Sequence, residues 1–186
     1  MADVARTRMT AAEFFEQPET TQITELIDGE LIVSPSPVDE HQKLTGRFHL
    51  YLDRITVQSN LQGELRVAPM DVYFDEENVP QPDVFWVSAS NEKCKLGEDG
   101  YWHGPPDLIV EVLSPSTARQ DKVTKFELYE RHGVREYWIA DPKYRNIEVW
   151  SLVDGKYTRL GLFSEKDTFT SPVLGQTVEV KEIFGA

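Results

Sequence analysis

The stretch Pro105-Pro106-Asp107-Leu108-Ile109-Val110-Glu111-Val112-Leu113-Ser114-Pro115-Ser116-Thr117 sets a single glutamate inside a run of aliphatic residues. From Leu108 to Leu113 the apolar residues do not alternate with polar ones, and several of them are β-branched. This pattern is typical of a strand that is buried on both faces of a sheet. We therefore expect a central strand here, with Glu111 as its one acidic residue.

The position of Glu111 needs a physical reason, because an ionised carboxylate in a buried strand costs several kcal/mol unless a cation or hydrogen-bond donors meet it. Two interpretations are open at this point. Glu111 either lies at an open strand end or sheet edge or pairs with a basic residue, or it belongs to a metal or catalytic site.

Length and composition favour a single globular domain over residues 1–186, since 40% of the 186 residues are hydrophobic. The single cysteine, Cys94, cannot form an internal disulfide, which favours a reducing cytoplasm. The N-terminal residues Met1–Arg6 are not followed by an apolar segment, and no stretch approaches the roughly 18 apolar residues of a membrane span. We expect a cytoplasmic protein without a membrane partner.

The charge of the chain is strongly acidic, with a formal net charge of −13. Because affinity for a polyanion comes from Lys and Arg that displace counterions, this charge argues against indiscriminate nucleic-acid binding. The charge is uneven: residues 10–40 hold eight acids and no Lys or Arg, whereas residues 119–145 hold seven Lys or Arg and five acids. A basic face near the helix that follows Glu111 is compatible with this distribution, and solvated surface charges are the alternative.

Turn residues and hydrophobic periodicity predict the order of the elements. Thr10 and Glu13 form the capping-box pattern of a short helix, Asp28-Gly29 predicts a hairpin over 24–33, and helical spacing of apolar residues predicts a long helix over 38–59. We further expect extended segments at about 64–74 and 82–88, an irregular stretch at 89–104, the buried strand at 107–113, a helix that ends near His132-Gly133, a strand over 135–140, a hairpin of 146–152 and 156–163, and a last strand near 176–181. From residue 38 the order is helix, three strands, helix, strand.

A second acid, Asp83, stands at the head of the apolar segment Val84–Val87, directly after Pro82. Proline is tolerated at the start or edge of a strand, so Asp83 marks a strand start. Two carboxylates on neighbouring strands repel each other unless a cation lies between them, and Mg²⁺ accepts one or two protein carboxylates together with several waters. A capping or turn role is the alternative for Asp83, but the pair with Glu111 points to a metal site.

The helix after Glu111 contributes a basic residue to the same region. With residues about 100° apart around the axis, the half that should face the sheet contains Ala118, Asp121, Lys122, Lys125, Phe126, Leu128 and Tyr129. Lys125 lies near the middle of this half and therefore points toward the strands that carry the acids. A buried stem with an exposed ammonium group, or a simple ion pair, is the alternative for such a lysine.

Taken together, Pro82-Asp83, Glu111 in Glu-Val-Leu-Ser-Pro-Ser-Thr and Lys125 in Asp-Lys-Val-Thr-Lys-Phe-Glu-Leu-Tyr resemble the Uma-two family of the restriction-endonuclease-like PD-(D/E)xK superfamily. The likeness covers nearly the whole chain. It implies an α/β (α+β) fold with a mixed central sheet flanked by helices, an α-β-β-β-α-β core over about 38–141, an N-terminal hairpin, and a C-terminal β extension over about 146–186.

The resemblance also implies a function: a Mg²⁺- or Mn²⁺-dependent endonuclease that hydrolyses phosphodiester bonds, with DNA as the expected substrate. It assigns catalysis to Asp83, Glu111 and Lys125, and the metal to Asp83 and Glu111. The sequence departs from the superfamily pattern at Leu113, where a lysine is usual, and Lys125 would replace that lysine from the helix. A non-catalytic binding or assembly module that keeps the fold is the alternative.

Five further residues are candidates for the outer part of this site: Glu30, His41, Gln81, Asp121 and Lys122. For Glu30 an edge charge on the hairpin is the alternative, and for His41 a capping or core role. A homodimer with an interface in the tail from Asn146 onward is also expected, because superfamily nucleases often pair their sites.

Overall fold

The computed structural model describes residues 8–18 and 20–185, so the N-terminal residues Met1–Arg6 lie outside the described residues. Its helices are α1 (Ala11–Phe15), α2 (Asp39–Gln58), α3 (Lys125–His132) and α4 (Val180–Phe184), and a π-helical turn, η1 (Gln120–Thr124), leads directly into α3. None of the helices within the described residues has the length and apolar content that a membrane-spanning helix requires.

A central sheet of six strands organises the fold. In order across the sheet these strands are β11 (Lys156–Ser164), β10 (Asn146–Val153), β9 (Glu136–Asp141), β8 (Leu108–Val112), β5 (Val84–Ser88) and β3 (Gly63–Val67). The pair β8–β9 is parallel and the other four pairs are antiparallel, so the sheet is mixed. The order α2-β3-β5-β8-α3-β9 confirms the predicted α-β-β-β-α-β core.

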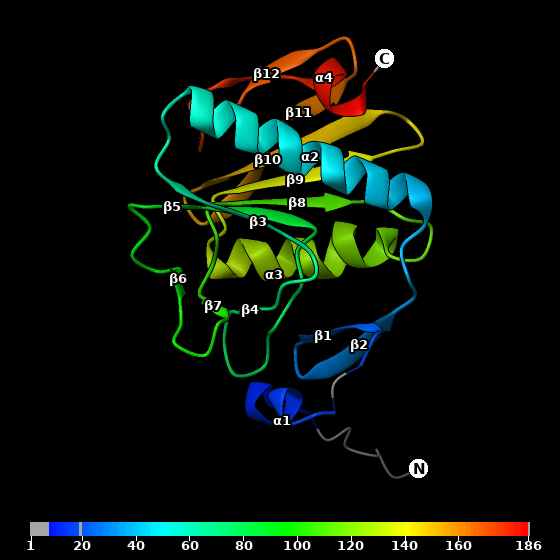
Figure 1. The fold of residues 1–186 in the computed structure, drawn as a ribbon, viewed down its shortest axis with the longest axis vertical. Coiled ribbons are helices and arrows are strands. Elements are labelled where there is room, and N and C mark those ends of the chain that lie inside the picture. Colours follow the sequence, from blue (N-terminus) through cyan, green and yellow to red (C-terminus); the bar gives the residue numbers. More distant parts are fainter. Residues whose placement is uncertain (1–7, 19, 186) are drawn as a thin grey trace.

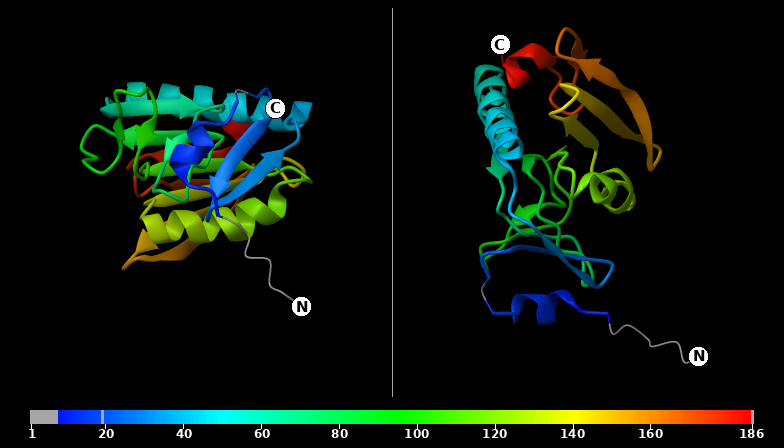
Figure 2. Two further views of the ribbon diagram at one scale, coloured as in Figure 1. Left: turned by 90° about the horizontal axis from the view of Figure 1, so that it is seen from below. Right: turned by 90° about the vertical axis from the view of Figure 1, so that its right-hand side faces the viewer.

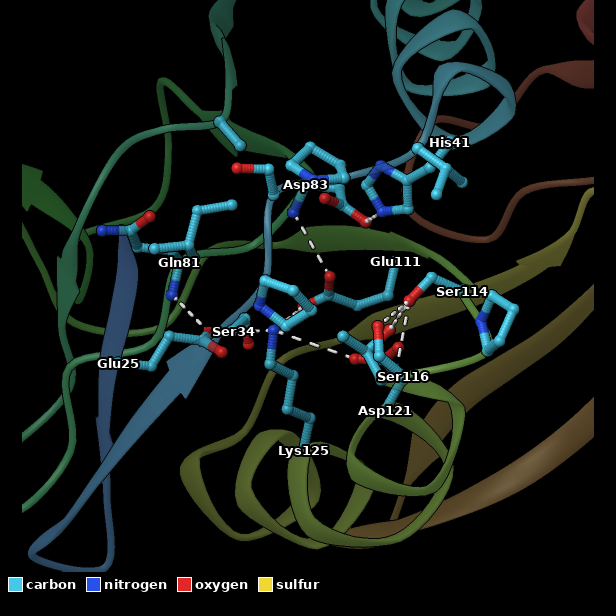
Figure 3. Close-up of a pocket in the computed structure, with 18 residues that line it drawn as sticks. Glu25, Ser34, His41, Gln81, Asp83, Glu111, Ser114, Ser116, Asp121 and Lys125 are labelled. Atoms are coloured by element: carbon cyan, nitrogen blue, oxygen red, sulfur yellow. Dashed lines mark hydrogen bonds and ion pairs between the residues drawn. The ribbon is translucent and has the colours of Figure 1, made fainter. Parts of the chain in front are cut away.

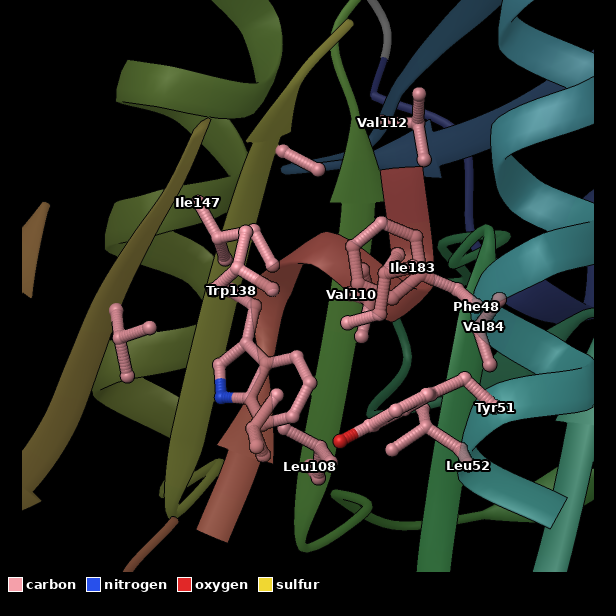
Figure 4. Packing of buried hydrophobic residues seen from close by; sticks show 14 of the residues in the cluster. Phe48, Tyr51, Leu52, Val84, Leu108, Val110, Val112, Trp138, Ile147 and Ile183 are labelled. Atoms are coloured by element: carbon pink, nitrogen blue, oxygen red, sulfur yellow. The ribbon is translucent and has the colours of Figure 1, made fainter. Parts of the chain in front are cut away.

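The two long helices lie on opposite faces of this sheet, α2 on one and α3 on the other (Figures 1 and 2). Beneath α2, a cluster of buried side chains joins the helix to the sheet and to α4, as Figure 4 shows for Phe48, Val110, Trp138 and Ile183. A second cluster, which includes Leu128 and Tyr129, fills the space beneath α3. Each apolar face of the sheet is therefore covered by a helix.

Strand β8 occupies the central position that its sequence predicts, and all five of its residues are buried. Its even-numbered residues, Val110 among them, belong to the cluster under α2, whereas Ile109 belongs to the cluster under α3. Because side chains alternate along a strand, Glu111 points to the α3 side. The interpretation of Glu111 as a sheet-edge residue is therefore wrong, but the alternative of a pair with a basic residue is confirmed, because Lys125 Nζ lies 3.0 Å from Glu111 Oε1.

The short helix and the hairpin predicted near the N-terminus are both present. Thr10 caps α1 and forms both hydrogen bonds of the capping box with Glu13. Strands β1 (Ile23–Ile27) and β2 (Glu30–Ser34) form the hairpin, and Asp28 and Gly29 take positive φ angles of 51° and 71° at its turn. A two-residue primed turn requires both of these angles.

The structure differs from the sequence expectations in two segments. The stretch at 89–104 is not irregular throughout: β6 (Lys95–Leu96) and β7 (Trp102–His103) form a small sheet with β4 (Val72–Tyr73). In the tail, β10 and β11 form the expected hairpin and extend the central sheet. The strand expected near 176–181 is only β13 (Thr177–Glu179), which pairs with β12 (Thr168–Thr170), and α4 begins at Val180. The short strands β4, β6, β7, β12 and β13 have two or three residues each, too few to show a periodic pattern.

Candidate active site

A cavity of about 260 Å³ opens at one end of the central sheet, between the N-terminal hairpin, the start of α2 and the start of η1 (Figure 3). Two serine- and proline-containing segments, 34–38 and 114–117, form part of its wall. Asp83, Glu111 and Lys125 all line this cavity.

The two predicted acids are brought together by the pairing of β5 with β8. Val84 lies opposite Val110, so Asp83, one residue before β5, lies beside Glu111. The backbone N–H of Asp83 donates to Glu111 Oε2 at 3.3 Å, and the backbone N–H of Val112 donates to Asp83 Oδ2 at 2.7 Å. The second bond fixes the Asp83 carboxylate at the strand end.

Lys125 reaches the acids from α3, and its Nζ atom lies 3.0 Å from Glu111 Oε1 and 2.9 Å from Glu25 Oε1. Asp121 Oδ1 is 3.8 Å away, and all four side chains are at most 5% exposed. Burial alone would lower the pKa of Lys125, but the three carboxylates raise it well above its ordinary value. The ammonium group is therefore charged at neutral pH.

Glu111 has a second close donor, the hydroxyl of Tyr129, which lies 2.6 Å from Glu111 Oε1. Burial raises the pKa of Glu111 well above its ordinary value, and the nearby acids add to this effect, while Lys125 opposes it. Burial also raises the pKa of Asp121 to about 6. The Oε1 atom of Glu111 is thus held by two donors, and Oε2 faces Asp83.

His41, near the start of α2, contacts the other acid: its Nε2 atom lies 3.1 Å from Asp83 Oδ2. Burial by itself lowers the pKa of His41, but the hydrogen bond and the charge of Asp83 raise it overall. Two buried polar atoms of residues that line the cavity, Nδ1 of His41 and Oε1 of Gln81, have no hydrogen-bond partner within the described part of the chain. Such atoms are rare in folded proteins and call for water, an ion or a ligand.

Two outer candidates do not lie at the site. Glu30, at the start of β2, is exposed and is not among the residues that line the cavity. Lys122 is also exposed, although a regular α-helix would turn it toward the sheet. The π-helical turn explains this, because its i→i+5 hydrogen bonds put more residues into one turn and rotate Lys122 outward. The placement of Lys122 on the sheet-facing half is wrong, while Asp121 and Lys125 keep the predicted side.

Sequence reasoning missed Glu25, which reaches the site from β1. Its side chain is 3% exposed and contacts Lys125, as described above, the backbone N–H of Gln81 at 2.8 Å, and the side chain of Gln120 at 2.9 Å. The hairpin signal at Asp28-Gly29 predicts the strand but does not show which side of it meets the core. The helical pattern predicted that Tyr129 faces the sheet, but it did not predict the contact of its hydroxyl with Glu111.

The donor set fits a hard divalent cation. Within residues 8–18 and 20–185, no group of three or more His, Cys, Asp or Glu side chains is arranged to enclose a metal. Mg²⁺ does not need such a cage, because it usually binds through one or two carboxylates and keeps several waters. Asp83 and Glu111 supply two adjacent carboxylates, and the unpaired oxygen of Gln81 gives a further acceptor in the same cavity.

Comparison with known proteins shows the family of the chain. The family model Uma2, described as "Putative restriction endonuclease", matches residues 11–181. The chain belongs to the Uma2 family. An uncharacterized protein of Synechocystis sp., sll1609, is 29% identical to this Uma2 chain over 188 residues, which cover 99% of this chain and 98% of that protein.

A solved structure shows the same fold. It is described as a "putative nuclease belonging to DUF820" from Anabaena variabilis, and it superposes on the Uma2 chain with a TM-score of 0.76. The superposition covers 95% of this chain and 97% of the other, at 19% sequence identity. The restriction-endonuclease-like fold expected from the sequence is therefore confirmed.

Proposed function

We propose that this Uma2 protein is a metal-dependent endonuclease that hydrolyses phosphodiester bonds, with DNA as its substrate. One observation carries the proposal: Asp83 and Glu111 lie side by side at a cavity, and Lys125 lies within hydrogen-bond distance of Glu111. Membership of a family described as putative restriction endonucleases agrees with this chemistry.

Asp83 and Glu111 would hold Mg²⁺ or Mn²⁺, which lowers the pKa of a bound water and stabilises negative charge on a phosphate. The chain fixes both carboxylates in advance. Asp83 is oriented by the N–H of Val112 and by His41, and Glu111 by Tyr129 and Lys125. Lys125 also supplies a positive charge that offsets the charge developing on the phosphate.

The metal site is tested by the effect of Mn²⁺ on the free energy of unfolding. At about 100 times its dissociation constant, Mn²⁺ should stabilise the wild type by roughly 2.7 kcal/mol. Asp83→Asn and Glu111→Gln should remove most of this gain, whereas Glu30→Gln, an exposed acid on the hairpin, should retain it. Equal stabilisation of all four proteins would rule out the site.

Catalysis is tested by nicking of supercoiled DNA in Mg²⁺ or Mn²⁺, which EDTA and Asp83→Asn should both abolish. RNA serves as the competing substrate in the same assay. If the wild type cleaves neither nucleic acid with either metal, the protein is better described as a non-catalytic binding or assembly module that keeps the fold.

We also propose that two copies pair through the tail from Asn146 onward. Strand β11 is an edge of the central sheet, and its side chains Leu160 and Leu162 are exposed. An exposed edge strand with apolar side chains is a template for pairing with another chain. A symmetric dimer would bring two active sites to one duplex.

A further inference from the structure

Glu25 is a buried carboxylate with an unusual set of partners. Its Oε1 atom accepts from the backbone N–H of Gln81 and contacts the ammonium of Lys125, and its Oε2 atom accepts from the side chain of Gln120. These partners come from the segment ahead of Asp83, from the π-helical turn and from the first residue of α3. Glu25 therefore links the segment before Asp83 to the helical segment that carries Lys125. Figure 3 shows Glu25 together with Gln81 and Lys125.

Lys125 lies between two carboxylates, those of Glu25 and Glu111. Lys125 Nζ lies at nearly the same distance from Glu25 and from Glu111, 2.9 and 3.0 Å. Without Glu25, Glu111 would be the only carboxylate of the described residues within hydrogen-bond distance of the ammonium, since Asp121 Oδ1 is 3.8 Å away. A divalent cation at Glu111 would then compete with a positive charge already bound there.

We propose that Glu25 is a positioning residue of the nuclease site: it holds the Lys125 ammonium between itself and Glu111, and so leaves Glu111 with enough negative charge to bind the divalent cation. This inference rests on the function proposed above. The same contact keeps the ammonium beside the site after a cation binds, because Lys125 stays paired with Glu25 when Glu111 turns its charge toward the cation.

Direct ligation of the cation by Glu25 is the competing explanation, and the contacts argue against it. The partners of Glu25 are Gln81, Gln120 and Lys125, and none of them is Asp83 or Glu111, the two residues that would hold the cation. The two explanations differ in one measurable respect. A positioning residue acts through Lys125, whereas a ligand acts on the cation regardless of which residue stands at position 125.

The experiment is a double-mutant cycle on Mn²⁺ affinity, measured by isothermal titration calorimetry. The proteins are wild type, Glu25→Gln, Lys125→Gln and the double variant, and Glu30→Gln is the matched acid-to-amide control on the same hairpin. Loss of the Glu25 charge weakens Mn²⁺ binding whether position 125 is lysine or glutamine. The difference between these two losses of affinity measures the part of the Glu25 effect that acts through Lys125. We expect Glu25→Gln to weaken binding about tenfold more when Lys125 is present, within the coupling found between contacting charged residues.

Equal losses in the two backgrounds, or no loss in either, would overturn the proposal. If the wild type binds no Mn²⁺, the proposed function fails and this inference fails with it. The same holds if Asp83→Asn and Glu111→Gln bind Mn²⁺ as tightly as the wild type does. If Lys125→Gln does not fold, a crystal structure of Glu25→Gln decides instead. There the ammonium should leave residue 25 and lie on Glu111 alone, and an unchanged Lys125 position would refute the proposal.

Discussion

The substitution Lys125→Met tests whether the acids of the site depend on one buried cation. Methionine keeps most of the side-chain volume but leaves Glu25 and Glu111 without the ammonium that now lies 2.9 and 3.0 Å away. Breaking a buried ion pair by removing one partner costs about 3–5 kcal/mol. For a chain of this length that corresponds to a fall in Tm of roughly 6–20 °C. Lys122→Met, an exposed lysine three residues away, should change the stability by less than about 0.5 kcal/mol.

The loss of stability in Lys125→Met should depend on pH, and the directions of the pKa shifts determine whether it grows or shrinks as pH falls. Burial raises the pKa of Glu111 and raises that of Asp121 to about 6. An acid with a raised folded-state pKa binds its proton more tightly in the folded protein, so stability is lost as pH rises from its unfolded to its folded pKa. Because the pKa of Lys125 is raised above its ordinary value of 10.5, its own contribution to stability is constant at pH values well below that. In the variant no cation opposes burial, so both acids protonate at higher pH and the stability difference from wild type narrows as pH falls.

Urea denaturation at pH 8 and pH 5, followed by tryptophan fluorescence, measures this difference. The gap should shrink by about 1.4 kcal/mol for each unit by which the folded-state pKa values of the variant exceed those of the wild type. A loss below about 1 kcal/mol at pH 8, which is the range of surface ion pairs, would refute the reasoning. So would an equal loss at both pH values.

Three further substitutions have defined outcomes. Tyr129→Phe removes the hydroxyl that donates to Glu111 and should lower the free energy of unfolding by about 1.5–3 kcal/mol in urea denaturation, as expected for a hydrogen bond to a charged group. Glu136→Leu should cost about 3 kcal/mol in the same assay, because it leaves the side-chain donors of Trp138 and Ser171 and the N–H of Val173 unpaired in the core. Leu162→Lys should shift a sedimenting dimer to a monomer without reducing Mn²⁺ binding; a wild type that sediments as a monomer would exclude the proposed pairing.

The fold could be predicted because its signals are local. The run Leu108–Leu113 predicts a buried strand, and the turns at Asp28-Gly29 and Asp154-Gly155 predict both hairpins. Gly133 ends the helix with a φ of 86°. The capping box of α1 involves only Thr10 and Glu13. Each of these signals spans a few residues and depends little on the rest of the chain.

The parts of the site that were missed depend on contacts between distant segments. Glu25 and Gln120 are 95 positions apart, and their contact exists only after the hairpin packs against the helix. The π-helical turn is a second example, since the residues Gln120–Thr124 have no pattern that distinguishes them from an α-helix. The interpretation of Lys122 as a sheet-facing residue followed from assuming regular helical geometry through this turn.

The position of the lysine on a helix has a physical explanation in the packing of β8. Residues 111 and 113 point to the same face of the strand, and Leu113 is buried there in the apolar cluster that also contains Leu128 and Tyr129. A lysine at position 113 would bury its stem and charge among these residues. Helix α3 packs against the same face of the sheet, and Lys125 reaches Glu111 from this helix. Lys125 and Tyr129 are four residues apart on α3, so one face of this helix places both donors on the same oxygen of Glu111. The helix can thus supply the cation while position 113 stays part of the core.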